Sequence, residues 1–328
     1  MFSVVIPVYR NEESLPALLE SLRRLALDVR QRHGAELEAV FVVDGSPDQS
    51  HLVLERALPQ TGYRAQLIRH SRNFGSFAAI RTGLAAATGD RFGVIAADLQ
   101  EPPELLLAFL DLLASGDYDV VVGCRETRDD PLPTRLASAL FWRLYRLLVI
   151  RDMPARGVDV FGCTRAFRDQ LLRLEEANSS LVGLLFWLGF RRAEVPYHRR
   201  ARQHGRSAWT LGRKVAYLFD SVFSFTDLPV RLLTALGALG LVVSVVFGSV
   251  VVLLKLLGQF DVPGYAATVV VVMFFGAINM LGLGIVGSYA WRGYENTKRR
   301  PLALVAEARS FPAAVHAAEP QPARGPRR

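Results

Sequence analysis

Two oxygen-bearing side chains, Asp98 and Gln100, follow an apolar stretch, residues 92–97, that is typical of a buried strand. Prolines at positions 102 and 103 prevent this strand from continuing, so both side chains are expected at the edge of a sheet. In open α/β sheets, ligands bind at the carboxyl ends of the strands. A carboxylate and an amide oxygen this close together suit Mg²⁺ or Mn²⁺, which would take its other ligands from water and a substrate diphosphate. We therefore predict a divalent-cation site here; the alternative is a helix-capping acid beside a surface amide.

The segments around this site alternate between strand-like and helix-like patterns. Short β-rich runs predict strands at residues 2–7, 38–43, 63–68, 92–97 and 119–123. Helical spacing of apolar residues predicts helices that begin near Leu15 and that span residues 77–87 and 103–115. This alternation favours a Rossmann-like α/β fold with a mostly parallel sheet covered on both faces. No Gly-x-Gly-x-x-Gly follows the first strand and no Walker A sequence occurs, so neither a dinucleotide cofactor nor P-loop chemistry is expected.

Two later segments, residues 232–254 and 266–290, are almost free of charge. Each is long enough to cross a bilayer, which needs about 20 residues, so we predict two transmembrane helices rather than shorter core helices with a polar stripe. The loop between them, residues 258–264, has no Lys or Arg, whereas four basic residues follow the second span: Arg292, Lys298, Arg299 and Arg300. The positive-inside rule then places both chain ends in the cytoplasm, although Lys255 opposes this slightly. No signal peptide is visible, which also keeps the N-terminal part there.

The basic residues suggest what the chain contacts. The net charge is +8 and the pI is about 9.9, but Lys and Arg lie among apolar and aromatic residues rather than in tracts. An anionic membrane surface explains this pattern better than nucleic acid, which we exclude as a partner. Residues 134–150, with Arg135, Arg143 and Arg146, fit either a helix at the membrane surface or a core helix with a basic edge. Residues 211–228 lead directly into the first span and are the stronger candidate for a membrane-surface helix.

Three further features bound the interpretation. Only two cysteines are present, so neither a disulfide framework nor a thiolate metal site is expected. Glycines 276, 282, 284 and 287 on the second span predict close helix packing between subunits, and hence a homo-oligomer. The tail from about Ser310 is rich in Ala, Pro and Arg and is expected to be disordered.

Short motifs occur in a fixed order along the chain. They are Val5-Ile6-Pro7-Val8-Tyr9 with Asn11-Glu12; Val43-Asp44-Gly45-Ser46 with Asp48; Arg72-Asn73-Phe74-Gly75; Ala97-Asp98-Leu99-Gln100 with Pro102-Pro103-Glu104; Gly157-Val158-Asp159; Val195-Pro196-Tyr197; and Gly205-Arg206-Ser207. With two C-terminal spans, this ordered set resembles the family 2 glycosyltransferases. The resemblance is strongest to the polyprenyl-phosphate glycosyltransferases related to dolichol-phosphate mannose synthase and bactoprenol glucosyltransferase, and it covers about residues 2–305.

Three positions depart from the family pattern. Ala96 replaces the first acid of Asp-Ala-Asp-Leu-Gln, and Val43 replaces the first of two acids before Gly-Ser. Both changes put the share of each acid in nucleotide binding in doubt. Ala208 replaces the lysine of a Ser-Lys pair in the acceptor motif, which removes a cation expected near the acceptor phosphate.

The resemblance implies a membrane enzyme with a GT-A domain. It would transfer a sugar from a nucleotide-diphosphate sugar to a polyprenyl phosphate such as undecaprenyl phosphate, by inversion and with a divalent cation, at the bacterial inner membrane. We expect a cytoplasmic GT-A domain at residues 1–210, a juxtamembrane amphipathic region at 211–230, a transmembrane hairpin at 231–291 and a cytoplasmic tail at 292–328.

The resemblance and the chemistry of the side chains together suggest site residues. Catalysis is assigned to Asp98 and Asp159. Asp159 would orient the acceptor or act as a mild base, and the alternative is a structural turn acid. The expected nucleotide-binding residues are Pro7, Tyr9, Glu12, Asp44 and Arg125, although Asp44 in isolation would favour an Asx-turn. The expected acceptor-phosphate residues are Arg200, Arg202 and Ser207. Guanidinium matches phosphate geometry, although attraction to anionic headgroups is the competing interpretation of the two arginines.

Two other functions compete with this one. A polysaccharide-extending family 2 enzyme would share the first third of the chain, but it would use more spans and a Gln-x-x-Arg-Trp motif, which is absent. A non-catalytic membrane subunit that binds nucleotide sugars would explain the missing acids at Val43 and Ala96, but it would not need the acceptor-side arginines.

Overall fold

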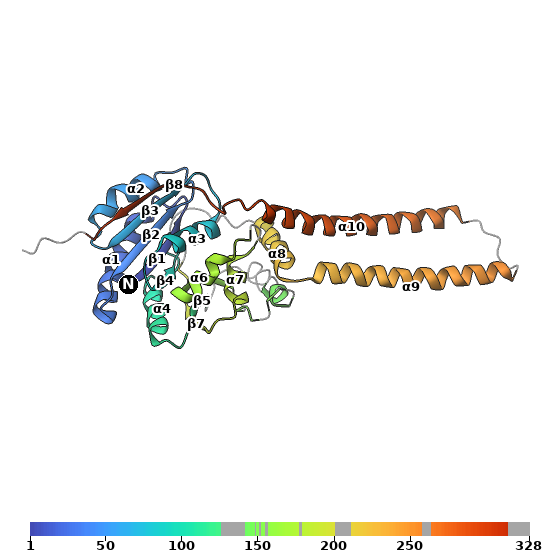
Figure 1. Ribbon diagram of the computed structural model, residues 1–328, viewed down its shortest axis with the longest axis horizontal. Coiled ribbons are helices and arrows are strands. Elements are labelled where there is room, and N and C mark those ends of the chain that lie inside the picture. The colour runs from blue at the N-terminus through green and yellow to red at the C-terminus, as the bar shows by residue number, and fades with distance from the viewer. Residues whose placement is uncertain are drawn as a thin grey trace, which may run out of the picture.

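The computed structural model describes residues 1–125, 142–147, 149–150, 152–154, 157–176, 179–200, 211–257 and 264–313. Two parts are distinguished in Figure 1: a sheet with helices packed on it, and two long helices that project from one side. Helix α8 (Leu211–Phe225) lies between them.

One eight-stranded sheet forms the first part, with the strand order β7-β5-β6-β4-β1-β2-β3-β8. Its strands are β1 (Phe2–Val8), β2 (Leu37–Val43), β3 (Arg64–His70), β4 (Arg91–Val94), β5 (Val120–Arg125), β6 (Val158–Thr164), β7 (Arg192–Tyr197) and β8 (Val305–Phe311). Only β6 and β8 run antiparallel to the others. The predicted α/β fold class with a mostly parallel sheet is therefore confirmed.

Helices cover both faces of the sheet, which is why its central strands are apolar almost throughout. One face packs against α1 (Leu15–His33), α2 (Ser50–Ala57) and α4 (Glu104–Ser115), and the short 3₁₀ helix η1 (Leu58–Gln60) follows α2. The other face packs against α3 (Ser76–Ala86), α6 (Arg165–Arg173) and α7 (Leu181–Trp187). In β1, Val4 and Ile6 join the first core and Val5 joins the second, as the alternation of side chains along a strand requires.

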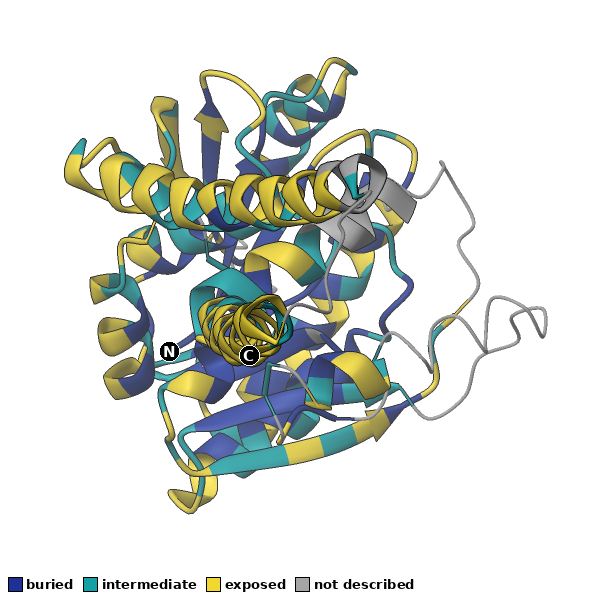
Figure 2. Cartoon of the chain, turned by 90° about the vertical axis from the view of Figure 1, so that its right-hand side faces the viewer, coloured by how far each residue is buried: buried dark blue, intermediate teal, exposed yellow. Residues whose placement is uncertain are grey.

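Two long helices contain the predicted spans. They are α9 (Leu228–Leu256) and α10 (Tyr265–Thr297), and both are long and apolar enough to cross a membrane. Their mean hydropathy reaches 2.6 and 1.9, and they are not buried within the chain. Figure 2 shows this contrast, since the long helices are mostly exposed whereas the central strands of the sheet behind them are buried. Apolar surface of this extent needs hydrocarbon or a partner to cover it.

The segment after α10 differs from expectation. Residues 305–311 form β8, which pairs antiparallel with β3, and the pairs run from Ala65 with Phe311 to His70 with Val305. The prediction that disorder begins at about Ser310 is therefore wrong for Ser310 and Phe311, which are part of the sheet. Residues 314–328 lie outside the described part of the chain. A polar, alternating strand such as Val-Ala-Glu-Ala-Arg-Ser-Phe has too few apolar residues to stand out by sequence pattern, and it folds because β3 offers an unpaired edge.

The two segments expected at the membrane surface pack against each other beside the sheet. Residues 142–147 are helical, and Tyr145 is fully buried and stacks on Tyr217 of α8 with ring centroids 5.9 Å apart. Phe219 of α8 is 58% exposed, whereas Ser221 is buried. Each helix thus has one face in the core and one outside; Arg135 lies outside the described residues.

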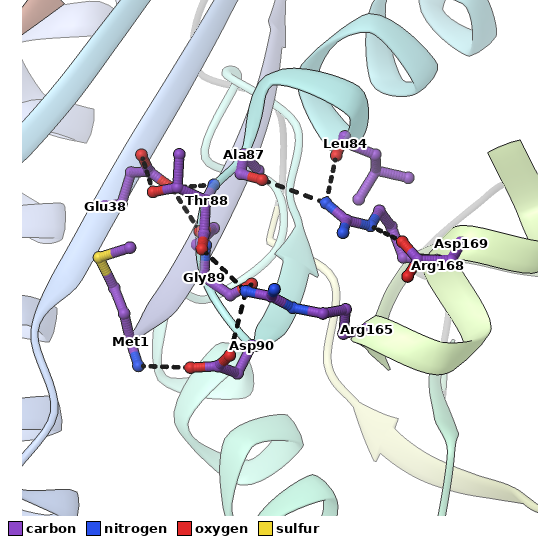
Figure 3. Close-up of polar contacts among 11 residues, drawn as sticks. Met1, Glu38, Leu84, Ala87, Thr88, Gly89, Asp90, Arg165, Arg168 and Asp169 are labelled. Atoms are coloured by element: carbon purple, nitrogen blue, oxygen red, sulfur yellow. Dashed lines mark hydrogen bonds and ion pairs between the residues drawn. The ribbon is translucent and has the colours of Figure 1, made fainter.

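A buried carboxylate ties the amino edge of the sheet together. Glu38 in β2 is 2% exposed and accepts hydrogen bonds from the Ser3 hydroxyl (2.5 Å), from the Gln66 amide (2.9 Å) and from both the N–H and hydroxyl of Thr88 (2.8 Å each). Figure 3 shows Glu38 beside Thr88, with Arg165 next to them on the carbonyl of Gly89. Burial raises the pKa of Glu38, but these hydrogen bonds outweigh burial and hold the pKa below its usual value.

We predict that Glu38→Ala destabilises the fold by about 2–4 kcal/mol, because it leaves several buried donors without an acceptor. The folded-state pKa lies below the unfolded value of about 4.3, so this stabilisation is present above that pH and is lost as the pH falls through the folded pKa. Thermal unfolding of the purified protein between pH 7 and pH 3 checks both points. Glu36→Ala, at an exposed position nearby, is the control and should change little; equal melting temperatures for the two variants would contradict the assignment.

Candidate active site

The parallel strands all end on the same side of the sheet, which we call the carboxyl edge. Most of the expected site residues lie there. β6 is antiparallel, so its first residues, including Asp159, reach the same edge. The described residues placed at or just beyond this edge are Pro7, Tyr9, Glu12, Asp44, Asp98, Gln100, Arg125, Asp159 and Arg200. Arg202 and Ser207 lie outside the described residues.

Pro7 opens the centre of this edge. The Val5 carbonyl accepts a hydrogen bond from the Ile95 N–H, so the backbone of every second residue of β1 from Val5 onward points toward β4. Pro7 is the next residue on that side, and it has no N–H to donate. The β1–β4 register accordingly ends at Val5 with Val94. The two strands separate there, which leaves room for the loop that carries Asp98.

The loop from Ile95 to Glu101 is held in an unusual conformation. The Ser14 hydroxyl at the start of α1 donates to the Ala97 carbonyl (2.7 Å), and the Gln100 N–H donates to the Asp98 carboxylate (3.2 Å). Leu99 between them has a φ of +56°, a left-handed conformation that costs a residue with a branched side chain about 1–2 kcal/mol. These bonds keep Asp98 half-buried at the edge of the sheet.

Gln100 links this loop to the segment after β7. Its carbonyl accepts from the Arg200 N–H (2.8 Å), and its side-chain amide donates to the Arg200 carbonyl (3.4 Å). Its side-chain oxygen accepts from the Arg199 guanidinium (2.7 Å), which also lies 3.3 Å from the buried Glu101 carboxylate. Arg200 itself is exposed and lies 3.6 Å from Glu104. The expected acceptor-side and metal-side segments are therefore in direct contact.

The donor chemistry of this loop fits a divalent cation that is shared with a substrate. No group of three or more His, Cys, Asp or Glu residues is clustered among the described residues, so the protein does not offer a complete cage there. Asp98 and Gln100 carry oxygen donors on one loop, and they would hold a Mg²⁺ or Mn²⁺ ion whose other ligands come from a substrate and water.

The loops after β1 and β2 are tied to each other by carboxylates. The Asp48 carboxylate accepts from the Glu12 N–H (3.2 Å), and the Glu12 carboxylate accepts in return from the Gln49 N–H (2.7 Å) at the start of α2. The Arg10 N–H donates to the Ser46 hydroxyl (2.8 Å). Glu12 thus fixes the loop before α2. Tyr9 nearby is 38% exposed, and the Arg10 guanidinium lies over its ring, 5.4 Å from the centroid.

Asp44 organises the loop after β3. It is 2% exposed and accepts from His70 Nδ1, from the Phe74 N–H and from the Gly75 N–H, each at 2.8 Å. Burial raises the pKa of Asp44, but the hydrogen bonds from His70, Phe74 and Gly75 outweigh it and hold the pKa below its usual value. Because the ionised Asp44 carboxylate accepts these three hydrogen bonds, it holds residues 71–75 against β2.

Gly45 allows the loops after β2 and β3 to touch. Its φ is +57°, and a Cβ at this position would overlap the backbone of Arg72 and Asn73. On the outer side of this contact the Arg72 guanidinium lies over the Phe74 ring, 4.2 Å from its centroid, and Phe74 packs edge-on against His70. The Arg72 guanidinium is therefore an exposed cation that is held over the Phe74 ring.

The carboxyl edge also faces the long helices. The Ser71 N–H donates to the Leu304 carbonyl (2.9 Å), directly before β8. Phe77 at the start of α3 packs against Tyr217 of α8, with ring centroids 6.4 Å apart. Further along α8, Asp220 pairs with Arg292 of α10 (2.6 Å).

Two residues of this site were missed by sequence reasoning. His70 ends β3, and its partner Asp44 lies 26 residues away in the sequence, so no local motif indicated it. Arg199 stood beside Arg200 in the same basic segment, where charge alone could not show which arginine turns inward.

We predict that Gly45→Ala weakens the binding of a nucleoside diphosphate at least tenfold, because the new methyl group displaces residues 72–73. Gly34→Ala is a matched control: it has a φ of +59° but no atom within 4 Å of the added Cβ. It should bear only the backbone strain of about 1–2 kcal/mol and keep normal binding. Isothermal titration with UDP and GDP checks the difference, and equal affinities in the two variants would rule out a role for this loop contact.

Comparisons with known proteins show the family to which the chain belongs. Residues 3–174 match the model of glycosyl transferase family 2. An uncharacterized glycosyltransferase of Synechocystis sp. is 30% identical over 93% of this chain and 94% of its own length. The undecaprenyl-phosphate 4-deoxy-4-formamido-L-arabinose transferase of Klebsiella pneumoniae is 31% identical over 91% of this chain and 90% of its own. Among solved structures, the glucosyl-3-phosphoglycerate synthase of Mycobacterium tuberculosis matches 68% of this chain and 79% of its own, at 17% identity and a TM-score of 0.48. The chain belongs to glycosyl transferase family 2 and is a glycosyltransferase, which confirms the predicted resemblance.

Proposed function

We propose that the chain transfers a sugar from a nucleotide-diphosphate sugar to a polyprenyl phosphate, such as undecaprenyl phosphate, at the cytoplasmic face of the bacterial inner membrane. The observation that carries this proposal is the position of the carboxyl edge beside the base of α10. Residues 298–304 connect α10 to β8, and a linker of this length spans at most about 25 Å. A phosphate at the end of a lipid in the bilayer could therefore reach the edge where the donor is expected to bind.

The acceptor chemistry explains why the site needs alignment more than a strong base. A phosphomonoester has a second pKa near 6 and is mostly dianionic at pH 7, so its oxygen is already a nucleophile. This oxygen attacks the anomeric carbon as the bond from that carbon to the diphosphate breaks, with inversion. Asp98 and Gln100 would hold the divalent cation, which supplies stabilisation of the negative charge on the departing diphosphate.

The remaining residues are assigned by their place at the edge. Pro7, Tyr9, Glu12 and Asp44 shape the nucleotide pocket, Glu12 and Asp44 through the backbone groups that they bind. Arg125 at the end of β5 contacts the diphosphate. Asp159 orients the acceptor or acts as a mild base. Arg200, Arg202 and Ser207 bind the acceptor phosphate.

The membrane arrangement follows from charge. Arg292 and Lys298 to Arg300 lie at the end of α10 nearest the sheet, so the positive-inside rule supports a cytoplasmic catalytic part and cytoplasmic termini. The two candidate spans support a multi-pass protein. Within the described chain, a Cβ on Gly276, Gly284 or Gly287 would meet no atom within 4 Å, whereas one on Gly282 would touch Leu233. The open glycines leave a smooth helix face for a second subunit, which supports a homo-oligomer. The name of the Klebsiella relative supports the acceptor class.

We predict that the purified protein with Mn²⁺ or Mg²⁺ consumes a nucleotide sugar only when a polyprenyl phosphate is present. Asp98→Ala should lower this transfer at least about a hundredfold, because it removes a charged ligand of the cation. Asp117→Ala, an exposed acid at the opposite edge, is the control and should keep full activity.

Mass spectrometry of lipid products after incubation with a panel of nucleotide sugars reads out both acceptor and sugar. A lipid-linked monosaccharide is the expected product. Elongation of a polysaccharide without lipid phosphate would contradict the acceptor assignment, and full activity of the Asp98 variant would contradict the site.

A further inference from the structure

Arg199 occupies the side-chain oxygen that the metal-site assignment needs. Its Nη2 atom donates to Gln100 Oε1 at 2.7 Å, and its Nε atom lies 3.3 Å from Glu101 Oε1. One guanidinium thus bridges an amide oxygen and a carboxylate that are adjacent in sequence.

Burial makes this contact more than a surface ion pair. The Glu101 side chain is 1% exposed and that of Arg199 is 25% exposed. A buried carboxylate without a nearby cation is strongly destabilising, so Arg199 has reason to remain close to Glu101. Its bond to Gln100 carries no such obligation, because a neutral amide oxygen can exchange one positively charged partner for another.

The backbone keeps Arg199 in place if that exchange occurs. The Arg200 N–H donates to the Gln100 carbonyl at 2.8 Å, which anchors the segment after β7 to the loop that holds Asp98. A guanidinium displaced from Gln100 would stay tethered next to the site and would have two donors available for a phosphate.

We propose that Arg199 is a placeholder cation: it holds Gln100 until a divalent ion and nucleotide bind, and the released guanidinium then binds the phosphate of the acceptor. The inference rests on the proposed function, and it adds an order of events to it. Metal and guanidinium cannot share one oxygen, because the two cations repel each other at that distance. Donor binding therefore prepares the acceptor site, and binding of the acceptor before the donor is disfavoured.

The test is direct measurement of Mn²⁺ binding in the presence of UDP and, separately, of GDP, by the EPR signal of free Mn²⁺. Arg199→Ala and Arg199→Lys should both bind Mn²⁺ about fivefold or more tightly than the natural chain, because the competitor for Gln100 is lost or shortened. Arg199→Lys keeps a positive charge beside Glu101, so it remains informative if the alanine variant folds poorly. The matched control is Arg191→Lys, which alters an arginine that bridges to Asp119 at the opposite edge and should leave Mn²⁺ affinity unchanged.

A second measurement separates this role from a purely structural one. In steady-state assays the same variants should raise the KM for the polyprenyl phosphate while the KM for the nucleotide sugar stays equal or falls. A general loss of folding would instead weaken the binding of both substrates and raise both KM values.

The outcomes distinguish the two levels of the proposal. If the natural chain binds Mn²⁺ in a way that depends on Asp98, but the Arg199 variants bind it no more tightly, the placeholder role is wrong and the proposed function stands. If the natural chain and all variants bind no Mn²⁺ with either nucleotide, the metal assignment and the placeholder role are both wrong.

Discussion

The attachment of the sheet to the two apolar helices is the constraint on which the rest of the structure depends. Those helices expose apolar surface whose contact with water is unfavourable, so their position indicates where the bilayer would lie. The chain holds them against the carboxyl edge at two places: α8 packs on the start of α3, and β8 returns from α10 to pair with β3. Under the proposed function, a catalytic edge fixed in this way would act on a lipid phosphate that stays anchored in the bilayer.

At that edge, carboxylates hold the loops together by accepting hydrogen bonds from backbone N–H groups. Asp44, Asp48 and Glu12 each join two loops that leave different strands. Loops held by charged acceptors are stiffer than loops held by packing alone, since such bonds are stronger than neutral ones. In our proposal the pocket is rigid where the nucleotide would bind, while Arg199 would exchange partners.

The sequence predicted a mostly parallel sheet, the strands β1 to β5 and both long helices, because these depend on apolar periodicity and on uninterrupted hydrophobic length, but it predicted neither β6 nor β7. It also placed Asp98, Asp44 and Tyr9 at one edge, since strand ends in a parallel sheet coincide. It did not predict β8, whose polar alternation resembles a loop, nor the inward turn of Arg199. Both depend on partners far away in the sequence: the free edge of β3 and the buried Glu101. Strand pairing and side-chain direction of this kind are determined by tertiary contacts, so residue type alone does not predict them.

The most direct test of the central claim is the distance between the metal-nucleotide site and the bilayer. The full chain would be placed in lipid nanodiscs with Mn²⁺ and a nucleoside diphosphate, and the ³¹P relaxation of the lipid headgroups would be measured. Our account predicts strong paramagnetic relaxation of the headgroups that disappears in Asp98→Ala. Headgroup relaxation that is the same in the natural chain and in that variant would contradict it, because the site would then lie away from the membrane or would not hold the ion.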